Sequence, residues 1–246
     1  MKLDAAAPAR GFLTAEWRYL AMINYEIDPR VLRSRVPAGT ELDAWQGRTF
    51  VSLVGFLFVG TRVYGWSIPF HRNFEEVNLR FYVRRRDNGG WRRGVAFIKE
   101  IVPRAGIAAV ARLLYNEAYV ALPMRHSIEA DTGSPPGRVE YGWSARGRWN
   151  RLTVRAGGEP RETALGSQEQ FITEHYWGYT VQRDGGSIEY QVEHPPWRVW
   201  PVSEAFLDCD VASLYGQEFA TALGAQPSSA FLAEGSPVTV REGRRL

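Results

Sequence analysis

Apolar and polar residues alternate along much of this chain with the two-residue period of β-strands. The clearest case is the segment 74–84, FEEVNLRFYVR. One face of this predicted strand carries Glu75, Val77, Leu79, Phe81 and Val83. The other carries Phe74, Glu76, Asn78, Arg80, Tyr82 and Arg84. Because charged and amide groups share the second face with aromatic rings, the pattern predicts either an exposed polar strand edge or the wall of a polar cavity.

A tight turn at Asp87-Asn88-Gly89-Gly90 predicts that this strand pairs with a second one over 94–102 in an antiparallel hairpin. Simple alternation places Val95, Phe97, Lys99 and Ile101 on one face of the second strand. Ala96, Ile98, Glu100 and Val102 share the other. Each face is therefore expected to hold one charge among apolar neighbours.

Three short helices are predicted from local signals. Asp28-Pro29 supplies an N-cap and a proline at the first helical position. The segment 105–115 carries apolar residues at helical spacing, and Ser167-x-x-Gln170 is a capping-box pattern.

Strands account for most of the remaining chain, with predicted ranges 12–26, 49–63, 138–144, 147–156, 179–183 and 187–194. The last two flank Asp184-Gly185-Gly186, a hairpin signal. We find no linker, so we expect one domain over 1–246, with 1–11 and 227–246 loosely ordered. Many strands and few helices predict a mainly β, α+β fold with closed or strongly curved antiparallel sheets.

Composition narrows the class of protein. The sequence has no apolar run long enough to span a bilayer and no apolar secretory segment, and it holds one cysteine, Cys209. These features predict a soluble cytoplasmic protein without a membrane partner. The net charge of +3 comes from scattered arginines, with only Lys2 and Lys99 as lysines. Scattered arginines do not form a phosphate-binding surface, so we expect no nucleic-acid partner.

Established site motifs are missing from the sequence. It contains no phosphate-binding glycine loop, no Cys-x-x-Cys, no His-x-x-x-His and no Gly-x-Ser-x-Gly, and its histidines are isolated from one another. We therefore predict neither a metal nor a cofactor.

Lys99 is the sharpest candidate for chemistry, because a buried amine with a lowered pKa can attack a carbonyl carbon. The alternatives for Lys99 are an ion pair with Glu76 or Glu100 and an exposed lysine.

Glu76, Asn78 and Arg80 would offer an acid or base, an amide and a carboxylate-binding fork. Glu100 would add a second acid on the neighbouring strand. Arg112 and Tyr115, at the end of the predicted helix, would either meet a ligand or form a helix-end hydrogen-bond network.

Several motifs, taken in order along the chain, resemble the uncharacterised YqjF-like family. They are YEIDP at 25–29, VPAG at 36–39, VSLV at 51–54, FEEVNLR at 74–80, Ala111-Arg112-x-x-Tyr115, FITE at 171–174 and HPPW at 194–197. That family is similar to the acetoacetate decarboxylase-like superfamily. The resemblance implies a curved, mainly antiparallel barrel with peripheral helices and a central cavity.

The same resemblance implies a glutamate matching Glu76 and a Schiff-base lysine within a lysine pair. The positions that match the pair, 116–119, hold no lysine. We therefore expect a small organic acid or carbonyl compound in the cavity, with Lys99 and Glu76 as candidate catalytic residues for lyase-type chemistry. The alternative is a non-catalytic ligand-binding or scaffold protein whose internal charges are structural. The oligomeric state stays open, with a homo-oligomer as one option.

Overall fold

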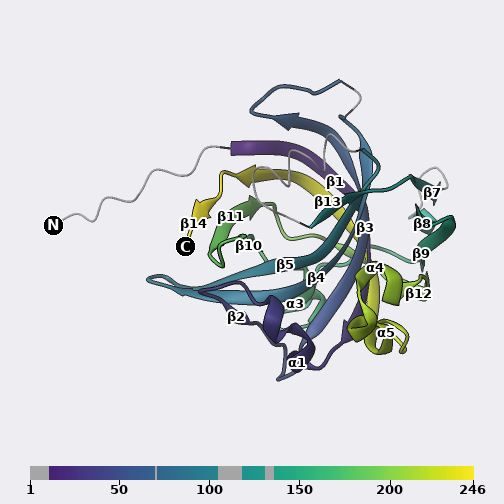
Figure 1. The fold of residues 1–246 in the computed structure, drawn as a ribbon. Helices are drawn as coiled ribbons and strands as arrows, with labels where there is room; N and C mark the ends of the chain where they lie inside the picture. Colours follow the sequence, from purple (N-terminus) through teal and green to yellow (C-terminus); the bar gives the residue numbers. More distant parts are fainter. Residues whose placement is uncertain (1–10, 70, 105–117, 131–135) are drawn as a thin grey trace.

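The computed structural model describes residues 11–69, 71–104, 118–130 and 136–246, and it is mainly β with a few short helices (Figure 1). Its strands are β1 Gly11–Glu26, β2 Glu41–Leu42, β3 Phe50–Val63, β4 Phe74–Asp87, β5 Gly90–Val102, β6 Tyr119–Ala121, β7 Met124–Ala130, β8 Pro136–Ala145, β9 Arg148–Ala156, β10 Trp177–Val181, β11 Ser187–Glu193, β12 Val199–Asp208, β13 Ser229–Arg241 and β14 Arg244–Arg245. Its helices are α1 Pro29–Leu32, the 3-10 turn η1 Arg33–Arg35, α3 Gln168–Thr173, α4 Val211–Tyr215 and α5 Gln217–Leu223.

Seven strands close on themselves in the order β11, β10, β5, β4, β3, β1 and β13. The ring is completed by the pairing of β11 with β13, at Val192↔Val240 and Glu193↔Thr239. Nearly all of these pairings are antiparallel, with β10 and β5 the parallel exception. Figure 1 shows the long strands β3, β4 and β5 curving around one side of this ring.

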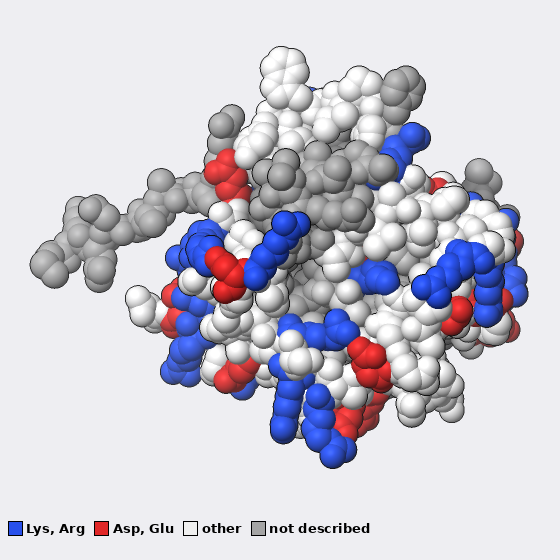
Figure 2. Space-filling model, in the orientation of Figure 1, with Lys and Arg blue, Asp and Glu red and all other residues white. Residues whose placement is uncertain are grey.

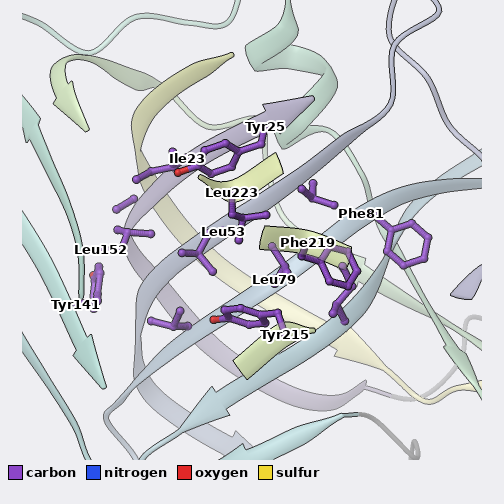
Figure 3. Close-up of a cluster of buried hydrophobic side chains, with 14 of the residues drawn as sticks. Ile23, Tyr25, Leu53, Leu79, Phe81, Tyr141, Leu152, Tyr215, Phe219 and Leu223 are labelled. Carbon is purple, nitrogen blue, oxygen red and sulfur yellow. The ribbon is translucent and has the colours of Figure 1, made fainter. Parts of the chain in front are cut away.

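A second layer covers the outer face of the ring. Strand β12 pairs first with β13 and further along with β9, and the sheet continues from β9 through β8 to β7. The helices α4 and α5 pack beside this sheet (Figure 1). Figure 3 shows Tyr215, Phe219 and Leu223 from these helices beside Leu53 and Leu79 of the ring. The layers meet closely at Gly55, where an added Cβ would lie 2.5 Å from the Tyr141 ring, so only glycine fits.

The inner face of the ring carries a separate buried cluster rich in aromatic rings. Phe50, Phe56 and Phe58 of β3 belong to it, together with Phe74 and Tyr82 of β4. Phe171 and Ile172 of α3 pack against the same cluster. Strand β3 is therefore buried on both faces, as its long apolar sequence indicates.

The predicted local signals form as expected. Asp28 caps α1 by accepting a hydrogen bond from the Arg30 amide, and Ser167 caps α3 through the Gln170 amide. The two predicted hairpins are β4–β5 and β10–β11. The helix predicted over 105–115 lies outside the described residues.

The expectation of loose order over 227–246 is wrong. Strand β13 occupies 229–241 and pairs along most of its length with β1, in addition to its contacts with β12 and β11. Its partners are far away in the sequence, and Gly235 and Pro237 within it look locally like a turn. Gly235 lies at φ 83° against the Trp17 carbonyl, so this glycine serves close strand approach.

Within the described ranges, no helix combines the length and apolar character needed to span a bilayer.

Candidate ligand-binding cavity

The inner face of the ring encloses a cavity of about 300 Å³. This volume lies at the lower end of the range of about 300 to 1,000 Å³ that is typical of small-molecule sites. Most of the lining is apolar or aromatic and comes from β1, β3, β4, β5 and the segment around α3. The polar side chains are few, which is the usual character of a site that orients a small ligand.

Strand β4 supplies the charged part of the wall. Glu76, Asn78 and Arg80 all line the cavity and are 3%, 2% and 9% exposed. The neighbouring Val77 and Leu79 face the outer layer instead. The polar face predicted from alternation is therefore a buried cavity wall and not an exposed strand edge.

Glu76 is held in place by two neutral hydrogen-bond donors. The Asn78 amide donates to Oε1 at 2.9 Å and the Tyr119 hydroxyl donates to Oε2 at 3.1 Å. Burial raises the pKa of Glu76 to about 7, although both hydrogen bonds and the Arg80 charge oppose the change. A carboxyl with such a pKa can both donate and accept a proton near neutral pH.

Arg80 is a buried cation that forms no ion pair with another described residue, although its charge acts on Glu76. Its Nη2 donates to the Ile172 carbonyl at 3.3 Å, and its guanidinium lies 5.8 Å from the Tyr82 ring centroid. Among the described residues, Nε has no hydrogen-bond partner and no carboxylate forms an ion pair with the side chain. A buried charge normally requires a counter-charge, so Arg80 is suited to receive an anion.

A β-bulge in β5 decides which charges of that strand reach the cavity. Leu79 pairs with Lys99 but Arg80 pairs with Phe97, so Ile98 is an extra residue without a partner on β4. After this bulge, residues of β5 that simple alternation would place on the inner face lie on the outer face, and the reverse. Val95, Phe97 and Glu100 line the cavity, and Lys99 does not.

The prediction that Lys99 lines the cavity is therefore wrong. Its Nζ donates to the Leu214 carbonyl of α4 and lies 5.9 Å from the Tyr215 ring centroid, on the outer side of the ring. Burial lowers the pKa of Lys99, and the charges of Arg146 and Arg35 act in the same direction. Neither the predicted ion pair with Glu76 nor that with Glu100 forms. Within the described residues, no lysine lines the cavity.

His175 is a cavity residue that the sequence analysis missed. Its Nε2 lies 3.2 Å from Asp43 Oδ2, and both side chains are almost fully buried. Arg93 also donates to Asp43 at 2.6 Å. Burial lowers the pKa of His175 to about 4, even though Asp43 raises it, so the imidazole is neutral. Nε2–H therefore donates to Asp43, and Nδ1 is left as an acceptor without a partner.

His194 also lines the cavity, inside a group of aromatic rings. It stacks on Trp197 with ring centroids 4.1 Å apart, and Trp17 lies 6.1 Å from Trp197. Burial lowers the pKa of His194 to about 4, against the hydrogen bond from Nδ1 to the Pro195 carbonyl. The motif HPPW was noticed in the sequence, but only the fold brings it next to β1.

Buried polar atoms that have no hydrogen-bond partner among the described residues gather at this cavity. They are Trp17 Nε1, Thr61 Oγ1, Asn78 Oδ1, Arg80 Nε and His175 Nδ1, and all five residues line it. Buried polar groups are nearly always hydrogen-bonded, so such a cluster indicates a place where a ligand or water completes the bonding.

The structure brings four of the predicted site residues together, namely Glu76, Asn78, Arg80 and Glu100. Arg112 and Tyr115 lie outside the described residues. Among the described residues, no group of three or more histidine, cysteine, aspartate or glutamate side chains could hold a metal ion.

Solved structures with a similar fold include two enzymes. The enduracididine biosynthesis enzyme MppR superposes with a TM-score of 0.67 at 14% identity, covering 99% of this chain and 90% of MppR. Acetoacetate decarboxylase from Legionella pneumophila gives a TM-score of 0.66 at 12% identity, covering 99% of this chain and 93% of that enzyme. At these identities the likeness shows the acetoacetate decarboxylase-like fold.

Sequence comparison gives the family. The uncharacterized protein YqjF of Bacillus subtilis (strain 168) is 25% identical over 187 residues, which cover 74% of this chain and 72% of YqjF. The model of the DUF2071 family, described as an uncharacterized conserved protein, matches residues 14–237. The chain therefore belongs to the DUF2071 family, and it has the acetoacetate decarboxylase-like fold.

Proposed function

We propose that this protein binds a small organic acid or carbonyl compound in the cavity of the ring, with the carboxylate of the ligand on Arg80. The observation that carries the proposal is the buried Arg80 guanidinium, which lines a mainly apolar cavity and forms no ion pair with a carboxylate of the described residues. A carboxylate would supply both the missing charge and the acceptor for Nε. MppR, which shares the fold at 13% identity, has been solved complexed with pyruvate, and this supports a ligand of the same class.

The test is a calorimetric titration with pyruvate and with its uncharged amide. We expect pyruvate to bind and the amide to bind far more weakly. In Arg80→Gln the affinity for pyruvate should fall about 10- to 100-fold, because a hydrogen bond to a charged group contributes about 1.5 to 3 kcal/mol.

The matched control is Arg86→Gln, which removes an exposed arginine from the same strand, outside the cavity lining. It should bind pyruvate as the unmodified protein does. Thermal unfolding of both variants checks that each is folded. Equal affinity for pyruvate and its amide, or an unchanged affinity of Arg80→Gln for pyruvate, would contradict the proposal.

Acid–base chemistry of lyase type is the second candidate, and the pKa of Glu76 near 7 favours it. In this role Glu76 would move a proton to or from the carbonyl compound while Asn78 and Tyr119 hold the carboxyl in place. The test is exchange of the methyl protons of pyruvate in deuterated water, followed by NMR. Exchange that needs Glu76 supports an enzyme, whereas binding without exchange supports the non-catalytic alternative. A Schiff base on Lys99 has no place in either role, because that amine lies outside the cavity.

A further inference from the structure

The cavity is elongated along strand β3. Five residues of this strand line it, namely Val54, Phe56, Phe58, Thr61 and Val63. From Val54 to Val63 the strand advances roughly 30 Å at about 3.3 Å per residue, and somewhat less where it bends. Lining residues spread over this length of one strand place the cavity along β3 and give it two ends, and we refer to it as the channel.

The charged groups occupy one end of this channel. In the β3–β4 register, Asn78 lies opposite Val54, Glu76 opposite Phe56 and Phe74 opposite Phe58. Arg80 lies one pair further in, opposite Ser52. Glu76 is therefore the last charged residue of β4 to line the channel in this direction, and the aromatic residues Phe56, Phe58 and Phe74 line the channel from there on.

The other end of the channel is chiefly apolar and reaches the surface. Phe12 and Leu13 of β1, Val63 of β3 and Val240 of β13 line it. Ile68, in the β3–β4 connection, lines the channel and is also 39% exposed, which marks the mouth. Thr61 and His71 are polar side chains in this half, and the His71 ring nitrogen already lies 2.7 Å from the Pro69 carbonyl.

We infer that the ligand is a monocarboxylate with a medium-length, unbranched apolar chain that runs from Arg80 along β3 towards Ile68. This inference rests on the proposed carboxylate site and adds the class of substrate. A dicarboxylate fits less well, because no arginine or lysine of the described residues lines the outer half of the channel to pair with its second charge. A lipid with two chains does not fit a cavity of about 300 Å³.

The experiment measures affinity across a chain-length series. Acetate, butanoate, hexanoate, octanoate and decanoate are titrated while the fluorescence of the tryptophans that line the cavity, Trp17, Trp177 and Trp197, is followed, with calorimetry as the second readout. We expect affinity to rise up to about fourfold for each added methylene, since burying one CH₂ contributes about 0.8 kcal/mol. Arg80→Gln should weaken all acids that bind by a similar factor.

A blocked channel provides the internal control. Val63→Phe adds a ring to the outer half and should weaken octanoate and decanoate while leaving butanoate unchanged. Val181→Phe makes the same substitution at a position that is 44% exposed on β10 and outside the lining, so it should change neither.

The outcomes separate the two claims. Affinity that depends on Arg80 but not on chain length overturns this inference and leaves the proposed carboxylate site intact. Equal affinity for an acid and the alcohol of the same chain length, or no binding by any acid, overturns the carboxylate site itself. Loss of butanoate binding in Val63→Phe would place the carboxylate at the outer end and overturn the proposed direction of the chain.

Discussion

The two faces of strand β4 differ sharply although their residues alternate one by one. The outward residues Val77, Leu79 and Phe81 pack into the layer formed with β8, β9, α4 and α5 (Figure 3). The inward residues Glu76 and Arg80 carry charges into a cavity. Unpartnered polar atoms occur in the outer layer too, but there they are the tips of large rings, such as Trp143 Nε1 and Tyr215 Oη. The outer face thus contributes mainly to stability. The inner face exposes polar groups to the cavity, which lowers the stability of the fold.

Charge on the visible surface has a different character from charge in the cavity. Figure 2 shows lysine and arginine side chains lying among aspartate and glutamate over the face that it presents. Charged side chains at the surface of the protein form ion pairs, for example Arg198 with Glu234 and Arg148 with Asp208. Such pairs contribute little to stability, about 0 to 1 kcal/mol each. The Arg80 guanidinium inside the ring, which forms no ion pair with the described residues, is therefore the more informative charge.

The largest effect should come from the outer face. Leu79→Ala removes a side chain that is fully buried between the ring and the outer layer. We expect the free energy of unfolding to fall by about 2 to 5 kcal/mol, measured by chemical denaturation. Leu165→Ala, at a residue that is 94% exposed, is the matched control and should change it by less than about 0.5 kcal/mol. If the folded Leu79→Ala protein bound carboxylates differently, the two faces would not be independent.

The second effect belongs to the inner face and depends on pH. Because the folded-state pKa of Glu76 is raised from 4.5 to about 7, its stabilising contribution is complete below pH 4.5 and is lost as pH rises through 7. At 1.36 kcal/mol per pKa unit, the loss amounts to about 3 kcal/mol. The side chain of Glu76→Gln cannot titrate. The difference in free energy of unfolding, variant minus unmodified protein, should therefore be about 3 kcal/mol larger at pH 8 than at pH 4.

Only the difference between the two proteins isolates Glu76. His175 and His194 have folded-state pKa values lowered to about 4, so they make stability rise with pH between about 4 and 6.5, which opposes the effect of Glu76. Both histidines are present in both proteins and cancel in the difference. A difference that stays constant across the pH range would mean that Glu76 titrates normally.

Local sequence patterns predicted the inner face of β4 well. The alternation of Glu76, Asn78 and Arg80 with Val77 and Leu79 is a two-residue period, and the strand keeps that period without interruption. The period alone could not decide between a cavity and an exposed edge. The buried aromatic residues Phe74 and Tyr82 on the same face were the sign that favoured the cavity.

The same reasoning failed on β5, because one extra residue in a strand reverses which face each later residue occupies. Nothing in VAFIKEIV shows that Ile98 lacks a partner, since the bulge depends on pairing with β4. The dyad of His175 and Asp43 was missed for a related reason, because 132 residues separate its members. Contacts of that kind are made by the closed ring and leave no mark in the local sequence.

The smallest expected effect tests the bulge directly. Lys99→Met keeps an apolar stem on the outer side and removes a hydrogen bond to Leu214, so the free energy of unfolding should change by no more than about 1 kcal/mol. Carboxylate affinity should stay within about twofold. Glu100→Gln, one residue further along, alters a cavity side chain and should change that affinity more strongly. If Lys99→Met weakened binding as much as Glu100→Gln did, the two residues would share a face, and the face exchange at Ile98 would be refuted.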